Sequence, residues 1–370
     1  MRAGLFAVVP TILMIMGCSD GASSSAGGGG SSTGGTGGTA GQSGTTGVGG
    51  NSGGSTGSGG TTTTNPTGES VTLRAEPCSK IPPQSSKCES FEVECEGLAP
   101  AIVDIATYEP TGVGSAKGTI LFGSGGEGTG FYNFTQMGKL LNAGYRVVDR
   151  RWPDGWFTGG TDGPQQTACR LAAVIRHLRA TVASEGLLCA TGNSGGSAEL
   201  GYALTWQGAG ASLDFAMPTS GPFHRLDLAC QGAADATWPT ECLDIVASVC
   251  PDCATNQCQL NNGPRSLIDK SFGPTPKCSA PADGDLEFLK ARSPELGPDV
   301  PGLGDLPIRF MIGKLDMGAY APLTSELHDA LLTAGANVEI AFIDGAEHEM
   351  EKTTPGANAI TEGLLANCVP

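Results

Sequence analysis

The chain is poor in basic residues and in histidine, and each shortage narrows the possible functions. Lys and Arg number 21 against 37 Asp and Glu, which gives a net charge of −16 at pH 7 and a pI near 4.6. Nucleic-acid binding needs a basic surface to meet the phosphates, so this class of partner is excluded. The sequence also lacks the G-x-x-x-x-G-K-[ST] motif of phosphate-binding loops, and a nucleotide site is therefore not expected.

The first 68 residues contain one short apolar stretch and otherwise almost nothing that can form a hydrophobic core. The apolar stretch 5–16 follows a single Arg and is typical of an export signal, too short to span a membrane as a helix. It ends in Gly17-Cys18, which resembles a bacterial lipobox. We therefore predict a signal peptide over 1–18 with lipidation at Cys18, which places the protein at the bacterial cell envelope. An ordinary signal peptide with a chance Cys, leading to secretion, is the alternative.

Residues 19–68 are nearly all Gly, Ser, Thr and Ala. Such a segment cannot bury apolar surface and is predicted to be a disordered linker. Its end-to-end distance would be about 35–40 Å. The membrane would thus be reached through the lipid anchor only, with the domain held clear of the surface.

Residues 69–370 have the size of one large domain in which strand-like and helix-like segments alternate. Predicted strands cover 101–108, 118–122, 145–148, 187–190, 213–217, 308–312 and 338–343. Predicted helices cover 133–142, 165–183, 197–206 and 322–333. This alternation predicts an α/β fold with a mostly parallel central sheet flanked by helices.

The segment 222–305 interrupts the alternation and is rich in Cys, Pro and Gly. We interpret it as a cap insertion over the C-terminal edge of the sheet; a structural excursion far from the site is the alternative. The chain has 13 cysteines, and without Cys18 twelve remain, an even number that in an exported protein favours disulfides. Six of them fall in or beside this segment and are expected to pair among themselves: Cys230, Cys242, Cys250, Cys253, Cys258 and Cys278. No suitably spaced His supports a zinc site here, so no metal is predicted.

A Gly-Asn-Ser-Gly-Gly pentapeptide occurs at 50–54 and again at 192–196. The first copy lies in the polar linker, whereas the second follows an apolar run and opens a helix-like run. A serine between glycines at a strand-to-helix turn is typical of a nucleophile elbow, in which Gly avoids collisions around the strained Ser. The context therefore selects Ser194 as the candidate nucleophile.

A serine hydroxyl needs a general base, usually His, and the base needs an orienting carboxylate. Of the four His, His348 follows the last predicted strand and is the candidate base. His177 is expected to have a structural role, and His328 is expected to be solvated. For His224, at the start of the predicted cap, contact with substrate is the most that is expected.

Two aspartates compete for the role of the orienting carboxylate. Asp316 follows the strand 308–312, whereas Asp344 lies only four residues before His348 on the same loop. A residue so close in sequence is less free to meet the far nitrogen of the imidazole. Asp316 is therefore preferred, with Asp344 as a turn residue.

The order Ser194…Asp316…His348, each after a separate strand, resembles the α/β-hydrolase family over residues 100–366. The resemblance implies an oxyanion hole built from the backbone N–H after the nucleophile and a donor from an earlier loop.

The implied oxyanion hole maps onto two glycine-rich stretches. Gly195 follows the nucleophile, and Ser124, Gly125 and Gly126 stand in the earlier loop where lipases and esterases often have His-Gly-Gly-Gly. This departure leaves the second donor open among those three residues, and a plain Gly-rich turn is the alternative.

An aromatic and basic stretch follows the strand 145–148, at a loop that borders the active site in this family. Arg151, Trp152 and Trp156 are predicted to contact substrate; an aromatic plug packed under the cap is the alternative.

Together these features predict a serine carboxyl-ester hydrolase that acts on a small-molecule or polymer ester without a cofactor. A serine peptidase or amidase on the same triad, and a non-catalytic binding protein on a hydrolase scaffold, are the rival interpretations. The oligomeric state is not indicated by the sequence.

Overall fold

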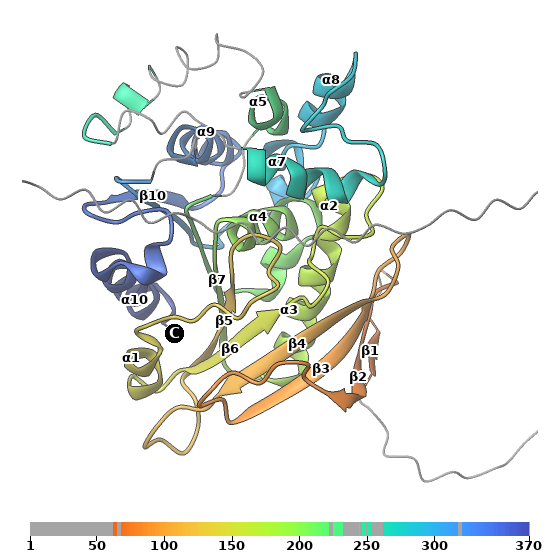
Figure 1. The fold of residues 1–370 in the computed structure, drawn as a ribbon. Coiled ribbons are helices and arrows are strands. Elements are labelled where there is room, and N and C mark those ends of the chain that lie inside the picture. The colour runs from red at the N-terminus through yellow and green to blue at the C-terminus, as the bar shows by residue number, and fades with distance from the viewer. Residues whose placement is uncertain are drawn as a thin grey trace, which may run out of the picture. The chain divides into compact units, whose positions relative to one another are not determined.

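One mixed sheet organises the part of the chain that the structure describes (Figure 1). The computed structural model describes residues 62–64, 68–221, 225–231, 244, 246–248, 250–253, 262–316 and 320–369. All of these belong to one compact unit, Gly57–Pro370. The predicted signal segment with Cys18, most of the predicted linker and His224 lie outside the described residues.

Ten strands make up this sheet, in the order β1-β2-β3-β4-β6-β5-β7-β8-β9-β10. Their bounds are β1 Thr62–Thr64, β2 Ser70–Pro77, β3 Lys87–Glu94, β4 Ala101–Tyr108, β5 Gly118–Gly123, β6 Arg146–Arg151, β7 Leu187–Asn193, β8 Phe215–Thr219, β9 Ile308–Gly313 and β10 Val338–Ile343. Neighbours from β1 to β4 and on to β6 are antiparallel, and those from β6 to β10 are parallel. The predicted mostly parallel sheet is confirmed, while β1 lies inside the stretch predicted as linker.

Helices cover both faces of the sheet. The described α-helices are α1 Met137–Asn142, α2 Pro164–Thr167, α3 Cys169–Thr181, α4 Gly195–Trp206, α5 Leu226–Gln231, α7 Asn262–Asp269, α8 Asp285–Lys290, α9 Tyr320–Thr333 and α10 Thr354–Asn367. Apolar side chains of α1 and α10 pack with one face of the sheet, and those of α3, α4 and α9 pack with the other. The helix predicted at 165–183 is divided into α2 and α3, and β2, β3 and α10 were not predicted.

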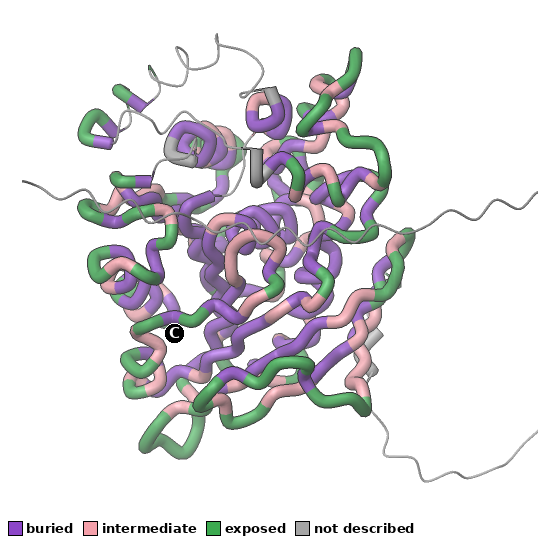
Figure 2. Tube along the Cα trace, in the orientation of Figure 1, coloured by how far each residue is buried: buried purple, intermediate pink, exposed green. Residues whose placement is uncertain are grey.

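The central strands are buried on both faces, as Figure 2 shows. All six residues of β5 are buried, which explains its continuous apolar run. By contrast, β3 at the antiparallel side mixes buried and exposed positions. The sheet is therefore double-covered in its parallel part, where βα units place helices on each side.

The segment between β8 and β9 forms the predicted Cys-rich insertion, with α5, α7, α8 and short 3₁₀ turns in its described part. Two of its disulfides, Cys230–Cys278 and Cys250–Cys253, lie within the insertion as expected, whereas Cys242 and Cys258 lie outside the described residues. The insertion contacts the loop after β5 through an ion pair between Lys270 Nζ and Glu127 Oε1 at 2.5 Å.

Three other disulfides staple the sheet and its helices. Cys78–Cys88 joins the ends of β2 and β3, Cys95–Cys169 ties β3 to α3, and Cys189–Cys368 ties β7 to the end of α10. Each bond closes a loop of the chain and reduces the freedom of the unfolded state.

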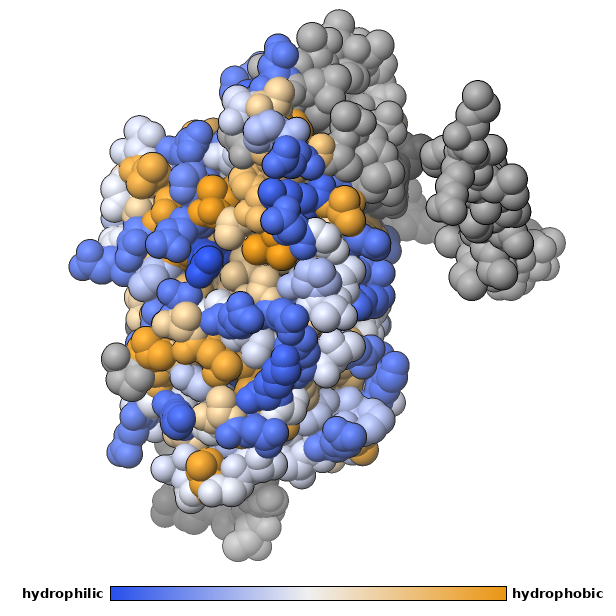
Figure 3. All heavy atoms as spheres, turned by 90° about the vertical axis from the view of Figure 1, so that its left-hand side faces the viewer, coloured by the Kyte–Doolittle hydropathy of each residue, from blue (hydrophilic) through white to orange (hydrophobic). Residues whose placement is uncertain are grey.

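The molecular surface is mixed in character. Figure 3 shows the face on the side of β10 and α10, where hydrophilic residues interrupt the hydrophobic ones. The exposed large apolar residues of the described chain, such as Ile81, Leu296 and Leu332, are far apart in sequence. Among the described residues, no helix combines the length and apolarity needed to cross a bilayer.

Candidate active site

Ser194 lies at a sharp turn between β7 and α4. Its backbone has φ 53° and ψ −117°, which a non-glycine residue rarely adopts. A Cβ on Gly192 would lie 2.6 Å from the Gly196 carbonyl, and a Cβ on Gly196 would lie 2.5 Å from the carbonyl oxygens of Gly123 and Ser124. The positions two residues before and two residues after Ser194 must therefore be glycine, because a side chain at either one would collide with the backbone.

The structure brings the three predicted side chains together. His348 Nε2 lies 2.9 Å from Ser194 Oγ, and His348 Nδ1 lies 2.9 Å from Asp316 Oδ2. The Asp316 side chain is fully buried, whereas the imidazole of His348 is 33% exposed. The serine follows β7, the aspartate β9 and the histidine β10, so three parallel strands deliver them to the same edge of the sheet. The distances suit a relay in which the carboxylate orients the ring and the ring removes a proton from the hydroxyl.

The competing candidates lie elsewhere. Asp344 is 88% exposed and forms an ion pair with Lys314 at 2.8 Å. His177 is buried in α3 with its ring edge against Phe91. His328 is half-buried in α9 beside Asp329 rather than solvated as predicted.

The loop after β5 crosses directly over the nucleophile turn. A Cβ on Gly125 would lie 3.2 Å from Ser194 Cβ, and a Cβ on Gly195 would lie only 1.9 Å from the Gly126 carbonyl oxygen. The Ser124 hydroxyl donates to the Gly130 carbonyl, so it serves the shape of the loop. The backbone N–H groups of the loop and of Gly195 therefore remain the candidate donors to an oxyanion next to Ser194.

The substrate contacts predicted for the aromatic stretch are wrong. Trp152 is 1% exposed and Trp156 is fully buried. Trp152 Nε1 donates to Glu199 Oε1 at 2.9 Å, and Trp156 Nε1 donates to the Gly126 carbonyl at 3.3 Å. The alternative, an aromatic plug packed under the cap, agrees with the structure in that both side chains are buried in the core.

Arg151 is likewise occupied within the protein and not directed at a ligand. Its guanidinium donates to Asp104 Oδ2 at 2.8 Å and to the Thr129 carbonyl at 2.7 Å. It therefore links the antiparallel strand β4 to the loop after β5.

Buried charges lie beneath the turn and were not singled out from the sequence. Burial raises the pKa of Asp149 to about 8, although the Tyr132 backbone N–H and Arg150 lower it. Burial also raises the pKa of Glu199 to about 7, and Arg150 and the Trp152 indole oppose this shift. For Glu199 the available signal was a single charged residue among the apolar residues of α4, whereas the two arginines that follow Asp149 hid any such signal in β6.

Metal ligation finds no support in the described residues, where no group of three or more His, Cys, Asp or Glu is placed to hold an ion.

The sheet order, the strained serine between β7 and α4 and the chain order of Ser194, Asp316 and His348 match one known architecture. The fold is that of an α/β-hydrolase. No family profile and no curated protein sequence matches the chain.

Solved structures of a lipase, a carboxyl esterase and a peptidase resemble the chain at low identity. A lipase in its open form is 17% identical, with a TM-score of 0.48 over 72% of this chain and 94% of the lipase. A thermostable carboxyl esterase from Bacillus coagulans is 15% identical, with a TM-score of 0.48 over 75% of this chain and 97% of the esterase. An acylaminoacyl peptidase from Pyrococcus horikoshii is 13% identical, with a TM-score of 0.49 over 81% of this chain and 48% of the peptidase.

Proposed function

We propose that this protein is a serine carboxyl-ester hydrolase that works through an acyl-enzyme. The observation that carries the proposal is the hydrogen-bonded series from Ser194 through His348 to Asp316, with both distances at 2.9 Å. The strained backbone of Ser194 supports it, because such strain concentrates at functional positions.

The reaction proceeds in two halves. Ser194 Oγ attacks the ester carbonyl while His348 Nε2 takes its proton, and Asp316 steadies the imidazolium. The N–H of Gly195 and backbone N–H groups of Ser124, Gly125 or Gly126 stabilise the negative oxygen of the tetrahedral intermediate. His348 then protonates the leaving alcohol, and water, activated by the same ring, releases the acid and restores the serine.

We propose a small-molecule or polymer ester as the substrate, approached from the side of the Cys-rich insertion. The ion pair between Lys270 of the insertion and Glu127 beside the oxyanion loop supports this direction. The N-terminal sequence supports attachment to the cell envelope through Cys18.

Labelling with a fluorophosphonate tests the proposal, because this probe forms a covalent bond only with an activated serine. The serine oxygen displaces fluoride from the phosphorus, so the intact mass is expected to rise by the mass of one probe less HF, with the label on the peptide that contains Ser194. Release of p-nitrophenol from p-nitrophenyl acetate should stop once labelling is complete. An unlabelled Ser194 in folded protein would support a binding protein instead, and a panel of matched esters and anilides separates esterase from amidase.

Alanine at Gly195 is expected to lower kcat for p-nitrophenyl acetate by about 10²–10³-fold, the effect of losing an oxyanion donor. Its Cβ would lie 1.9 Å from the Gly126 oxygen, so the two backbones must separate. The control is Gly138→Ala in α1, where a Cβ meets no atom within 4 Å and kcat should be unchanged. Full activity of Gly195→Ala would show that the loop does not supply a donor.

A further inference from the structure

Arg150, at the end of β6, lies beneath the oxyanion loop. Its side chain is 1% exposed. A Cβ on Gly123 would lie 2.5 Å from its Nη2, and a Cβ on Gly128 would lie 3.2 Å from its Nη1. Arg150 also lines a small internal cavity together with Gly123 and Gly196. The guanidinium is therefore in contact with the backbone of the loop at both ends and lies next to the nucleophile turn.

Glu199 provides the other half of this contact. It is fully buried in α4, five residues after Ser194, and forms an ion pair with Arg150 Nη2. Its second oxygen accepts from Trp152 Nε1 at 2.9 Å. Because α4 begins at the residue after Ser194, Glu199 is fixed relative to the nucleophile by one short helix.

We propose that the buried Arg150–Glu199 ion pair is a positioning device that fixes the oxyanion loop against the helix of the nucleophile. The inference rests on the proposed function and assigns the pair a role in kcat. The free-energy cost of removing two charges from water is about as large as the free energy gained from their attraction. A buried ion pair is therefore weak evidence for a contribution to folding stability. Its geometric effect here is to hold two separate segments, the 123–128 loop and α4, at one spacing.

Neighbouring residues of β6 support the same assignment. Asp149 accepts the Tyr132 backbone N–H at 2.9 and 3.1 Å, and Arg151 donates to the Thr129 carbonyl at 2.7 Å. Three consecutive charged residues thus each hold a different part of the chain after β5. Of the three, Arg150 alone is paired with the helix of Ser194.

The first test is Glu199→Gln, which keeps the volume and an oxygen for Trp152 while removing the charge. We expect kcat for p-nitrophenyl acetate to fall about 10–100-fold, a fraction of the loss caused by removing an oxyanion donor. KM should stay within about twofold, because the ester ground state does not use the donors fully. Binding of a trifluoromethyl ketone, which forms the oxyanion adduct, should weaken in parallel with kcat/KM.

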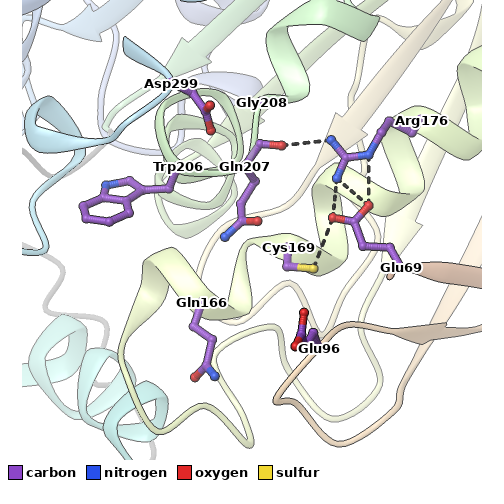
Figure 4. Close-up of a pocket in the computed structure, with 9 residues that line it drawn as sticks. All are labelled: Glu69, Glu96, Gln166, Cys169, Arg176, Trp206, Gln207, Gly208 and Asp299. Carbon is purple, nitrogen blue, oxygen red and sulfur yellow. Dashed lines mark hydrogen bonds and ion pairs between the residues drawn. The ribbon is translucent and has the colours of Figure 1, made fainter. Parts of the chain in front are cut away.

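The matched control is Glu69→Gln, shown with its partner in Figure 4. Glu69 is 3% exposed and its two oxygens both contact the guanidinium of Arg176, so it is another buried half of an ion pair. It lines a surface pocket with Gln207 and Gly208 at the C-terminal end of α4, away from the loop. Its loss should lower Tm and leave kcat within about twofold.

The outcomes separate the two proposals. If the wild type cleaves no ester, the proposed function fails. If the wild type is active and Glu199→Gln lowers only Tm, as Glu69→Gln does, the positioning role is wrong. Should Glu199→Gln not fold, Trp152→Phe removes the indole donor to Glu199 without changing charge; kcat is expected to fall about 3–10-fold, and an unchanged kcat overturns the inference.

Discussion

Replacing His348 with alanine is expected to lower kcat for p-nitrophenyl acetate by about 10⁶-fold, the loss seen when a serine hydrolase loses its general base. The ring nitrogen that accepts the proton lies 2.9 Å from Ser194 Oγ, and alanine leaves nothing in that place. Combining the change with Ser194→Ala should add almost no further loss, because the two side chains act as a unit. Stopped assays with purified variants measure both values.

The control for this change is His328→Ala. His328 is half-buried in α9 and contacts Asp329, so its removal should alter kcat by no more than about twofold. If His348→Ala retained a tenth of the wild-type rate, another group would have to serve as the base and the proposed mechanism would be wrong.

Asparagine at Asp316 is expected to lower kcat by about 10⁴-fold. Asp316 Oδ2 lies 2.9 Å from His348 Nδ1, and its side chain is fully buried. An amide can present an N–H to the ring and select the tautomer in which Nε2 is protonated, so that Nε2 cannot accept from the serine. The fold should persist, because the two side chains have nearly the same shape.

Asp344→Asn is the control for Asp316→Asn, because it also removes a negative charge at the same edge of the sheet. Asp344 is 88% exposed and pairs with Lys314, an arrangement that contributes little to stability. The kcat of the Asp344→Asn variant should equal that of the wild type within about twofold. Equal losses in the two variants would contradict the assignment of Asp316 to His348.

That Ser194, Asp316 and His348 lie close together could be predicted because each follows a mostly apolar run by a few residues. β7, β9 and β10 are mostly hydrophobic, although Arg309 interrupts β9 and Glu339 interrupts β10, and parallel strands end at one edge. Chain order and local pattern were therefore enough to bring Ser194, Asp316 and His348 together. The distances themselves depend on register and could not be read from the sequence.

The antiparallel strands were harder to predict. β2 and β3 carry many polar residues, since they lie at the open side of the sheet, and their alternation is broken by a register shift between Leu73 and Pro77. The signal for α10 was present and overlooked. The Thr353 side chain caps the helix by accepting from Gly356 N–H at 3.2 Å, and Pro355 stands in the first turn.

The aromatic stretch was misread because its partner is distant in sequence. Trp152 and Glu199 are 47 residues apart, and only the folded sheet shows that the indole faces inward. A motif of two tryptophans and a cation fits a ligand surface as well as a buried scaffold. Whether such a motif binds a ligand or packs internally depends on contacts with residues far away in the sequence. A local sequence pattern carries no information on those contacts.

The place of His348 after β10 has a consequence for the order in which the site is completed during folding. The nucleophile turn is translated more than 150 residues before its base, with a separation of 154 positions. A chain that has folded only as far as β9 would contain the strained turn, yet Ser194 would lack a base until β10 pairs with β9 at the sheet edge. Reactivity at Ser194 would thus depend on the completed sheet, so a partly folded chain would be protected from attack by its own serine.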